Sequence, residues 1–288
     1  MTPAQIRAAF PARDEYAHKG STGAGLLVAG SYKMPGAAII AAKGALNSGI
    51  GLLSLAFPDC IYGAVTAHLT ESLLLPCFST SEGCFTDDGF EGIFERARGV
   101  RAVAAGPGLG LSEATKNLVY RLITETEKPL VLDADALNAV ALDTEILLSR
   151  KKDPDGKPYP TLITPHPGEM SRLIGYSIAI VQDERKQNAE VFARKYGVYI
   201  LLKGHDTVVA SPYGETYINR TGCPAMARGG SGDLLTGMLL SFLSQRIEPY
   251  TALCAAAYYH GLAGERAAAK YGEYCATVER IADEIRIR

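Results

Sequence analysis

The sequence predicts an α/β fold with a central, mostly parallel sheet, helices on both faces and an antiparallel hairpin at one edge. Two observations lead to this fold class. Short apolar segments alternate with helical segments through most of the 288-residue chain, which is typical of parallel strands covered on both faces. Two later segments, 207–210 and 216–219, flank the turn sequence at 212–214 in the pattern of a β-hairpin.

The predicted strands are short apolar runs that end at glycines, prolines or polar turns. Before the hairpin they lie at residues 25–30, 51–57, 71–77, 101–105, 130–132, 161–164 and 198–202. The predicted helices have apolar residues at helical spacing or are rich in alanine. They cover residues 2–10, 36–48, 112–127, a short stretch after 168, 183–196, 230–244 and most of 251–285. Thr2 and Ser112 are the N-cap residues expected for two of them.

Composition excludes several classes of protein. Hydrophobic residues make up 47% and charged residues 21% of the chain, which is ordinary for an ordered globular protein. The net charge of −2 gives no electrostatic basis for binding nucleic acid. None of the 6 cysteines forms a Cys-x-x-Cys pair, so we expect neither a structural zinc site nor a disulfide framework.

The chain carries no visible targeting or linker segment. No apolar run is long enough for a membrane helix, and residues 1–18 lack the apolar core of a signal peptide. We therefore expect a cytoplasmic protein with no membrane partner. The most linker-like stretch, 151–160, is short enough to be a surface loop. We expect residues 1–288 to form a single domain.

The strongest local signal is the glycine-rich segment 227–237, with the sequence ARGGSGDLLTG. Its glycines precede an apolar helix, so their backbone N–H groups would lie at a helix N-terminus, a place that favours phosphate. Asp233 would lie at the same end, where a carboxylate could take a proton from a hydroxyl that attacks a phosphoryl group. The alternative is a glycine-rich turn capped by Asp233. No Gly-Lys-Ser/Thr follows, so this is not a Walker A loop.

Four further clusters follow predicted strands, where open α/β sheets place their ligands. They are GPGLG at 106–110, DADALN at 133–138, TPHPGE at 164–169 and KGHDT at 203–207. Two prolines hold His166 in a stiff loop, and Lys203 could meet a phosphate as a point charge. Each cluster also has a purely structural interpretation: a turn, a helix capped by Asp135, a surface loop or a polar hairpin entry.

Together with His18-Lys19-Gly20 and the MPGAA of 34–38, these segments resemble the ADP- or ATP-dependent NAD(P)H-hydrate dehydratases, a branch of the ribokinase-like superfamily. They occur in the family's order and span nearly the whole chain. The resemblance implies a three-layer ribokinase-like fold. It also implies an enzyme that returns the S-form of hydrated NADH or NADPH to NAD(P)H while it hydrolyses ADP or ATP, with Mg²⁺ as cofactor and a homotetrameric assembly.

The resemblance also implies roles for particular residues. By the family pattern Ala37, Gly108, His166 and Asp233 line the site of the hydrated nicotinamide nucleotide. The adenine nucleotide would be bound by Lys203, Gly204, His205, Asp206 and Thr207, together with Gly229, Gly230, Ser231 and Gly232. Asp233 matches the base of the superfamily. Two positions depart from the pattern: Cys223 stands where the family usually has Asn, and Ser231 where it often has Thr.

The chemistry that follows is a phosphoryl transfer. Phosphorylating the hydroxyl of the hydrate turns a poor leaving group into phosphate, which the ring nitrogen can then expel. Asp233 would act as base, and the amides of 229–232 would bind the phosphate charge. A second possibility is a small-molecule kinase of the same superfamily acting on a sugar or vitamin alcohol, and a third is a non-catalytic nucleotide sensor. An NAD(P)HX epimerase on a separate chain is the expected functional partner.

Overall fold

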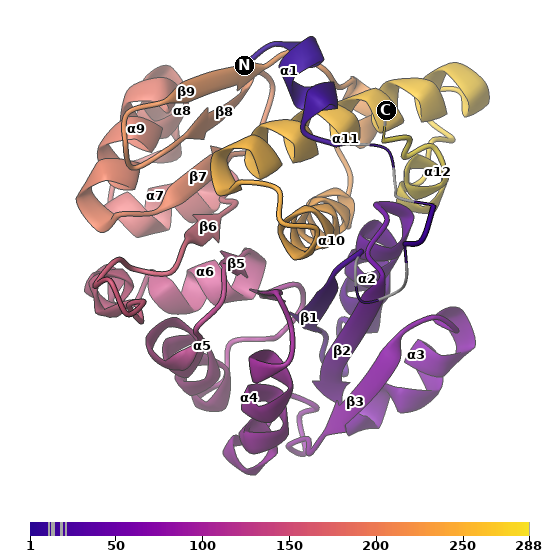
Figure 1. Ribbon diagram of the computed structural model, residues 1–288, viewed down its shortest axis with the longest axis vertical. Coiled ribbons are helices and arrows are strands. Elements are labelled where there is room, and N and C mark those ends of the chain that lie inside the picture. The colour runs from indigo at the N-terminus through magenta and orange to yellow at the C-terminus, as the bar shows by residue number, and fades with distance from the viewer. Residues whose placement is uncertain (11, 13–14, 18–19, 21, 288) are drawn as a thin grey trace.

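The computed structural model describes residues 1–10, 12, 15–17, 20 and 22–287. Its centre is a nine-stranded sheet with the order β3-β2-β1-β4-β5-β6-β7-β8-β9 (Figure 1). The strands are β1 (Ala24–Val28), β2 (Leu52–Pro58), β3 (Leu73–Cys77), β4 (Ala102–Ala105), β5 (Leu130–Leu132), β6 (Thr161–Ile163), β7 (Tyr199–Leu202), β8 (Thr207–Ala210) and β9 (Thr216–Asn219).

The strand directions confirm the predicted mixed sheet. All pairs from β3 through β7 are parallel, and β8 and β9 add an antiparallel hairpin at one edge. The central strands are buried on both faces, so their sequences are continuously apolar rather than alternating. Because β5, β6 and β7 are neighbours and parallel, the polar clusters that follow them meet at one edge of the sheet.

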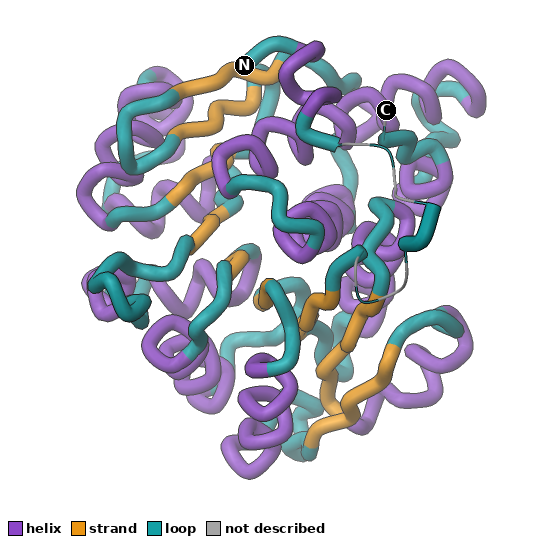
Figure 2. The backbone as a smooth tube through the Cα atoms, viewed as in Figure 1, coloured by secondary structure: helices purple, strands orange, loops and turns teal. Residues whose placement is uncertain are grey.

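Helices cover both faces of the sheet, as Figure 2 shows. They are α1 (Pro3–Ala8), α2 (Pro35–Asn47), α3 (Tyr62–His68), α4 (Phe90–Arg98), α5 (Glu113–Glu125), α6 (Ala134–Val140), α7 (Pro167–Ile174), α8 (Ile178–Asp183), α9 (Arg185–Tyr196), α10 (Ser231–Ser244), α11 (Pro249–Tyr271) and α12 (Val278–Asp283). Buried residues of α1–α3 and α10–α12 belong to one hydrophobic cluster, and those of α4–α9 belong to the other. Consecutive residues of β1 alternate between them: Leu27 packs in the first, and Leu26 and Val28 in the second.

Several helices were absent from the sequence prediction. Helices α3 and α8 are short, and α3 buries little besides Val65, so their apolar patterns are weak. Helix α4 does have an amphipathic pattern, with Phe90, Ile93, Phe94 and Ala97 buried, and it was overlooked. The predicted helix at 183–196 is α9, which begins at Arg185, and α8 ends just before it at Asp183.

Helix α10 is fixed in place by unusually close packing against α2. A methyl group at Gly237 would overlap the backbone carbonyl oxygen of Ala41, and one at Gly44 would overlap that of Leu234. Only glycine allows two helix backbones to approach so closely. This contact fixes α10, whose first turn carries Asp233, relative to the sheet.

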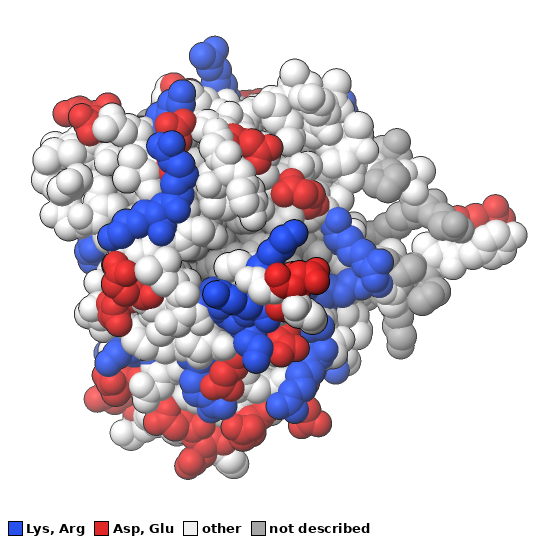
Figure 3. Space-filling view, turned by 60° about the vertical axis from the view of Figure 1, so that its left-hand side comes forward, with Lys and Arg blue, Asp and Glu red and all other residues white. Residues whose placement is uncertain are grey.

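The surface has no strong preference for one charge on the face shown in Figure 3, where acidic and basic side chains are interspersed. In the part of the chain that the structure describes, no helix is both long and apolar enough to span a bilayer.

Candidate active site

A cavity of about 750 Å³ lies where β5, β6 and β7 end. It is closed by the loop after β7, the segment that leaves β9, the first turn of α10 and one side of α11. Its lining includes Asp133, His166, Glu169, His260 and the segments 203–207, 219–224, 226–227 and 231–233. The structure therefore brings together three of the clusters predicted at strand ends, those at 133–138, 164–169 and 203–207, with the glycine-rich segment 227–237. The cavity has the size of a small-molecule site and, like such sites, is lined by both polar and apolar residues.

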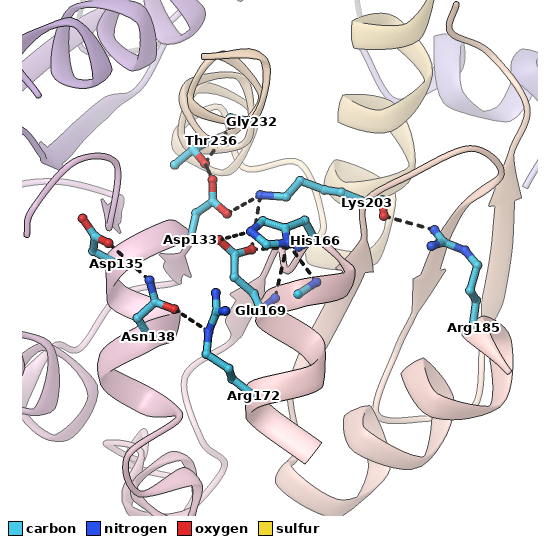
Figure 4. Close-up of polar contacts among 11 residues, drawn as sticks. Asp133, Asp135, Asn138, His166, Glu169, Arg172, Arg185, Lys203, Gly232 and Thr236 are labelled. Atoms are coloured by element: carbon cyan, nitrogen blue, oxygen red, sulfur yellow. Dashed lines mark hydrogen bonds and ion pairs between the residues drawn. The ribbon is translucent and has the colours of Figure 1, made fainter. Parts of the chain in front are cut away.

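A buried ion pair lies at the base of this cavity (Figure 4). Lys203 Nζ is 2.7 Å from Asp133 Oδ1, and the Thr236 hydroxyl donates to Asp133 Oδ2 at 2.7 Å. Burial disfavours the ammonium of Lys203, but the charges of Asp133, Glu169 and Asp233 and the hydrogen bond to Asp133 together outweigh burial, so the pKa of Lys203 is raised. Lys203 therefore presents a fixed positive charge to any anion that enters the cavity.

His166 and Glu169 lie beside this ion pair. His166 is the N-cap of α7, and its Nδ1 accepts hydrogen bonds from the backbone N–H groups of Gly168 and Glu169. The backbone N–H of His166 donates to Glu169 Oε2 at 2.7 Å, which completes a capping box. Burial, followed by the charge of Lys203, lowers the pKa of His166. The imidazole is therefore neutral near pH 7, with Nδ1 as acceptor.

Asp233 lies in the first turn of α10, facing the same cavity. Burial, and after it the charge of Asp133, raise the pKa of Asp233 to about 7, while Lys203 opposes them. A carboxylate with such a pKa can both accept and release a proton near neutral pH, which suits a general base.

The glycine turn does not lie wholly before the helix. Gly230, the N-cap of α10, has φ +89°, whereas Gly232 already lies inside the helix. A Cβ on Gly232 would lie 3.2 Å from Lys203 Nζ. Ser231 and Gly232 line the cavity, whereas Gly229 and Gly230 are not among its described lining residues.

The loop 203–207 lines the cavity throughout. Asp206 has φ +53°, and the Thr207 hydroxyl donates to the carbonyl oxygen of Gly204 at 2.8 Å. The side chain of His205 is 97% exposed, so it is free to contact a ligand that enters from solvent.

Ala37 and Gly108 contact each other but do not belong to the lining of this cavity. A Cβ on Gly108 would lie 2.8 Å from Ala37 Cβ, and Gly108 has φ +63°. The loop that contains Gly108 is tied to the N-terminal end of α6, because the N–H of Gly110 donates to Asp135 Oδ2 at 2.8 Å, and Asp133 and Ala134 at that end of the helix line the cavity. The alternative interpretation of Asp135 as an N-cap is wrong, because Asp133 occupies the N-cap position of α6. His18 and Lys19 lie outside the described residues.

The sequence analysis missed His260, which comes from the interior of α11. It is buried beside the glycine turn, with Nε2 3.4 Å from Ser231 Oγ. Burial, with a smaller contribution from Lys203, lowers the pKa of His260 to about 4, so the ring is neutral. A single histidine in an alanine-rich helix gives no sequence signal. Cys223, one of the departures from the family pattern, also lines the cavity.

The fold indicates the class of protein to which the chain belongs. A ribokinase-like superfamily protein from Enterococcus faecalis V583 superimposes with a TM-score of 0.83 at 23% identity, covering 99% of this chain and 93% of that one. The fold is therefore ribokinase-like, as predicted.

The chain belongs to the NAD(P)H-hydrate dehydratase family, whose model matches residues 25–286. The ADP-dependent (S)-NAD(P)H-hydrate dehydratase of Bacillus subtilis (strain 168) is 35% identical over 92% of this chain and 88% of its own length. The crystal structure of a B. subtilis ADP/ATP-dependent NAD(P)H-hydrate dehydratase, co-crystallised with ATP/Mg²⁺, matches with a TM-score of 0.81 at 32% identity, covering 99% of this chain and 95% of that one.

Longer relatives also match. The bifunctional NAD(P)H-hydrate repair enzyme Nnr of Moorella thermoacetica is 40% identical over 95% of this chain, but over 50% of its own length. The Nnr enzyme of Gloeobacter violaceus gives a similar match. The chain thus spans about half the length of these relatives.

Proposed function

We propose that this protein dehydrates the S-form of hydrated NADH or NADPH to NAD(P)H and drives the reaction by hydrolysis of ADP or ATP. The observation that carries the proposal is Asp233, a carboxylate with a pKa near neutrality at the start of α10, in one cavity with the Lys203 ammonium. Membership in the NAD(P)H-hydrate dehydratase family supports the substrate. The relatives named as ADP-dependent dehydratases support the co-substrate.

The proposed chemistry has two steps. Asp233 takes the proton of the hydrate hydroxyl as its oxygen attacks the terminal phosphorus of ADP or ATP, and the bond to the leaving nucleotide phosphate breaks. The ring nitrogen then donates its electron pair, the carbon–oxygen bond breaks and inorganic phosphate leaves. Loss of a proton from the neighbouring ring carbon restores the dihydropyridine. The net result is one water removed from the hydrate and one phosphoanhydride hydrolysed.

We assign the binding residues on the family pattern together with the cavity. Lys203, Gly204, His205, Asp206 and Thr207 would bind the adenine nucleotide, with the turn formed by Gly229, Gly230, Ser231 and Gly232. Ala37, Gly108, His166 and Asp233 would bind the hydrate. The loop of Gly108 is tied by the hydrogen bond between Gly110 and Asp135 to the end of α6 whose residues Asp133 and Ala134 line the cavity, which supports a hydrate site beside the nucleotide pocket rather than inside it.

Mg²⁺ fits the donor set of this cavity. The described residues contain no group of three or more His, Cys, Asp or Glu side chains arranged as a metal cage, but Mg²⁺ usually uses one or two carboxylates with phosphates and water. Both oxygens of Asp133 and of Glu169 already have protein partners, so phosphate oxygens and water would hold most of the ion, with Asp233 contacting it through a water. When bound, Mg²⁺ would spread the charge of the transferring phosphoryl group.

Three further points belong to the proposal. We place the protein in the cytoplasm as a homotetramer, and we treat residues 1–288 as one domain because one sheet runs through nearly the whole chain. We also propose an NAD(P)HX epimerase as functional partner. An enzyme that accepts only the S-form leaves the R-form unrepaired unless the two interconvert.

One experiment separates this proposal from a small-molecule kinase. The protein is incubated with the NADH hydrate and either ADP or ATP, while the absorbance of the reduced nicotinamide and free phosphate are followed. We expect both to rise in equal amounts. Accumulation of a stable phosphoester would favour the kinase, and no recovery of absorbance with either nucleotide would contradict the dehydratase.

A further inference from the structure

Arg185, the first residue of α9, reaches the loop that follows β7 (Figure 4). Its Nη2 donates to the carbonyl oxygen of Leu202 at 2.9 Å and to that of Lys203 at 3.2 Å. Its Nη1 donates to Gln182 Oε1 at 2.7 Å, which ties the guanidinium to α8. One planar cation thus holds two successive carbonyl groups just where the chain leaves the sheet.

The next residue, Gly204, leaves room for this guanidinium because it has no side chain. A Cβ on Gly204 would lie 2.9 Å from Arg185 Nη1 and 3.0 Å from Nη2, and Gly204 has φ +143°. Asp206 also has a positive φ, and its carboxylate favours the charged form of Arg185 electrostatically. The unusual backbone of this loop therefore occurs together with a fixed cation behind it, and such backbone conformations persist only when their surroundings hold them.

Arg185 acts from outside the cavity. It is not among the lining residues in the described chain, whereas every residue from Lys203 to Thr207 is. In Figure 4 the side chain of Lys203 extends toward Asp133 and its carbonyl oxygen faces Arg185 on the opposite side, so a substitution at Arg185 reaches a ligand only through the loop.

We propose that Arg185 is a positioning residue for the nucleotide, because it holds the loop 203–207 in the conformation that binds ADP or ATP. This inference rests on the proposed function. It predicts that loss of the Arg185 side chain weakens binding of the nucleotide but not binding of the hydrate. The hydrate side of the site, around Gly108 and His166, is held by other contacts, those of Asp135 and Glu169.

The test compares Arg185→Met with Arg194→Met. Arg194 lies on the same helix and is exposed, and its one hydrogen bond to the described residues runs from Nε to the carbonyl oxygen of Glu190 within α9. Calorimetry gives the Kd of ADP and of ATP, and steady-state rates give the KM of each substrate. For Arg185→Met we expect the nucleotide Kd and KM to rise about tenfold, the size of effect typical for losing a charged hydrogen-bond donor. The KM of the hydrate should stay within about twofold of wild type, and Arg194→Met should match wild type in all of these values.

Arg185→Lys is the second variant, and it decides the question if Arg185→Met does not fold. Lysine keeps the charge but lacks the planar fork that serves two carbonyls and Gln182 at once, so we expect it to recover only part of the nucleotide affinity. Nucleotide affinity equal to wild type in both variants, or an equal rise in the KM of nucleotide and hydrate, would overturn the positioning role. Absence of ADP and ATP binding by the wild-type protein would instead contradict the proposed function, and this inference with it.

Discussion

The side chains around Lys203 carry more negative charge than one ammonium can balance. Asp133, Glu169 and Asp233 all interact with it, and Asp133 lies closest at 2.7 Å. Burial is the main cause of the raised pKa values of Asp233 and Glu169, the negative charge of Asp133 adds to it, and Lys203 opposes it. At the scale of single residues, the cavity is therefore a place where a proton is held near neutral pH.

Replacing Asp233 by Asn should separate binding from turnover. The amide keeps the shape of the side chain but cannot accept the proton, and loss of a general base typically lowers a rate by about 10²–10⁴. We expect Asp233→Asn to lose turnover by that order while ADP and ATP still bind in calorimetric titrations. Near-normal turnover would remove Asp233 from its assigned role.

The pH dependence follows from the same pKa. Asp233 must be ionised to act as a base, and its pKa in the free protein is raised to about 7, so kcat/KM should rise with pH through that region. Asp133→Asn removes a nearby negative charge, which favours the ionised form of Asp233 and moves the rising limb to lower pH. Rates measured from pH 5 to pH 9 in both proteins test this shift, and a limb that stays in place or moves up would contradict it.

His166 should serve the hydrate and not the nucleotide. It follows β6, whereas the proposed nucleotide loop follows β7. We expect His166→Ala to raise the KM of the hydrate and to leave that of ADP or ATP nearly unchanged. Because the side chain also caps α7, some loss of stability, about 1 kcal/mol, should accompany the change. The reverse KM pattern would assign this loop to the nucleotide.

At the scale of elements, α10 joins two functions along its length. Its first turn carries the cavity residues Ser231, Gly232 and Asp233, and its middle packs against α2 through Gly237. The sequence indicated the first function through the glycine pattern. It did not indicate the second, because nothing local shows that a carbonyl of α2 lies against Gly237.

Gly237→Ala should unfold the protein or strongly destabilise it, since the added methyl group overlaps the backbone of α2 and neither helix can move away freely. Gly63→Ala is the matched control, because Gly63 also lies in a helix but has no atom within 4 Å of its Cβ position. Alanine there should raise stability slightly. Chemical denaturation of both variants measures the difference, and similar midpoints would contradict the packing argument.

Gly232→Ala, at the other end of the same helix, should fold but lose most activity with both nucleotides. Its Cβ would crowd Lys203 Nζ at 3.2 Å, and that ammonium is held by Asp133. The residue lies inside the helix, so backbone strain is not the cause. Thermal melts beside rate measurements decide between an effect on the site and an effect on folding, and full activity would show that Lys203 shifts without consequence.

At the scale of the whole molecule, the sheet was largely predictable and the contacts between its layers were not. Strand positions follow from local apolar runs bounded by glycine and proline, and β5, β8 and β9 have the predicted bounds. The polar clusters at the strand ends also predicted the position of the site, because neighbouring parallel strands end at the same edge of the sheet. Some side chains of the site contact residues that are distant in the sequence, so no local pattern predicts them. They are those of His260, Thr236 and Arg185.

The packing of α10 on α2 also bears on how the chain is made. Residues of β1 and α2 are synthesised well before α10, the helix that covers α2 and reaches β1. Until it emerges, the apolar face formed by Ala38, Ala41, Ala42 and Ala45 has no cover from α10. Contacts this distant in sequence form slowly and leave nascent chains prone to aggregation. A ribosome that stalls before residue 231 would therefore release a product that lacks Asp233 and exposes this apolar face.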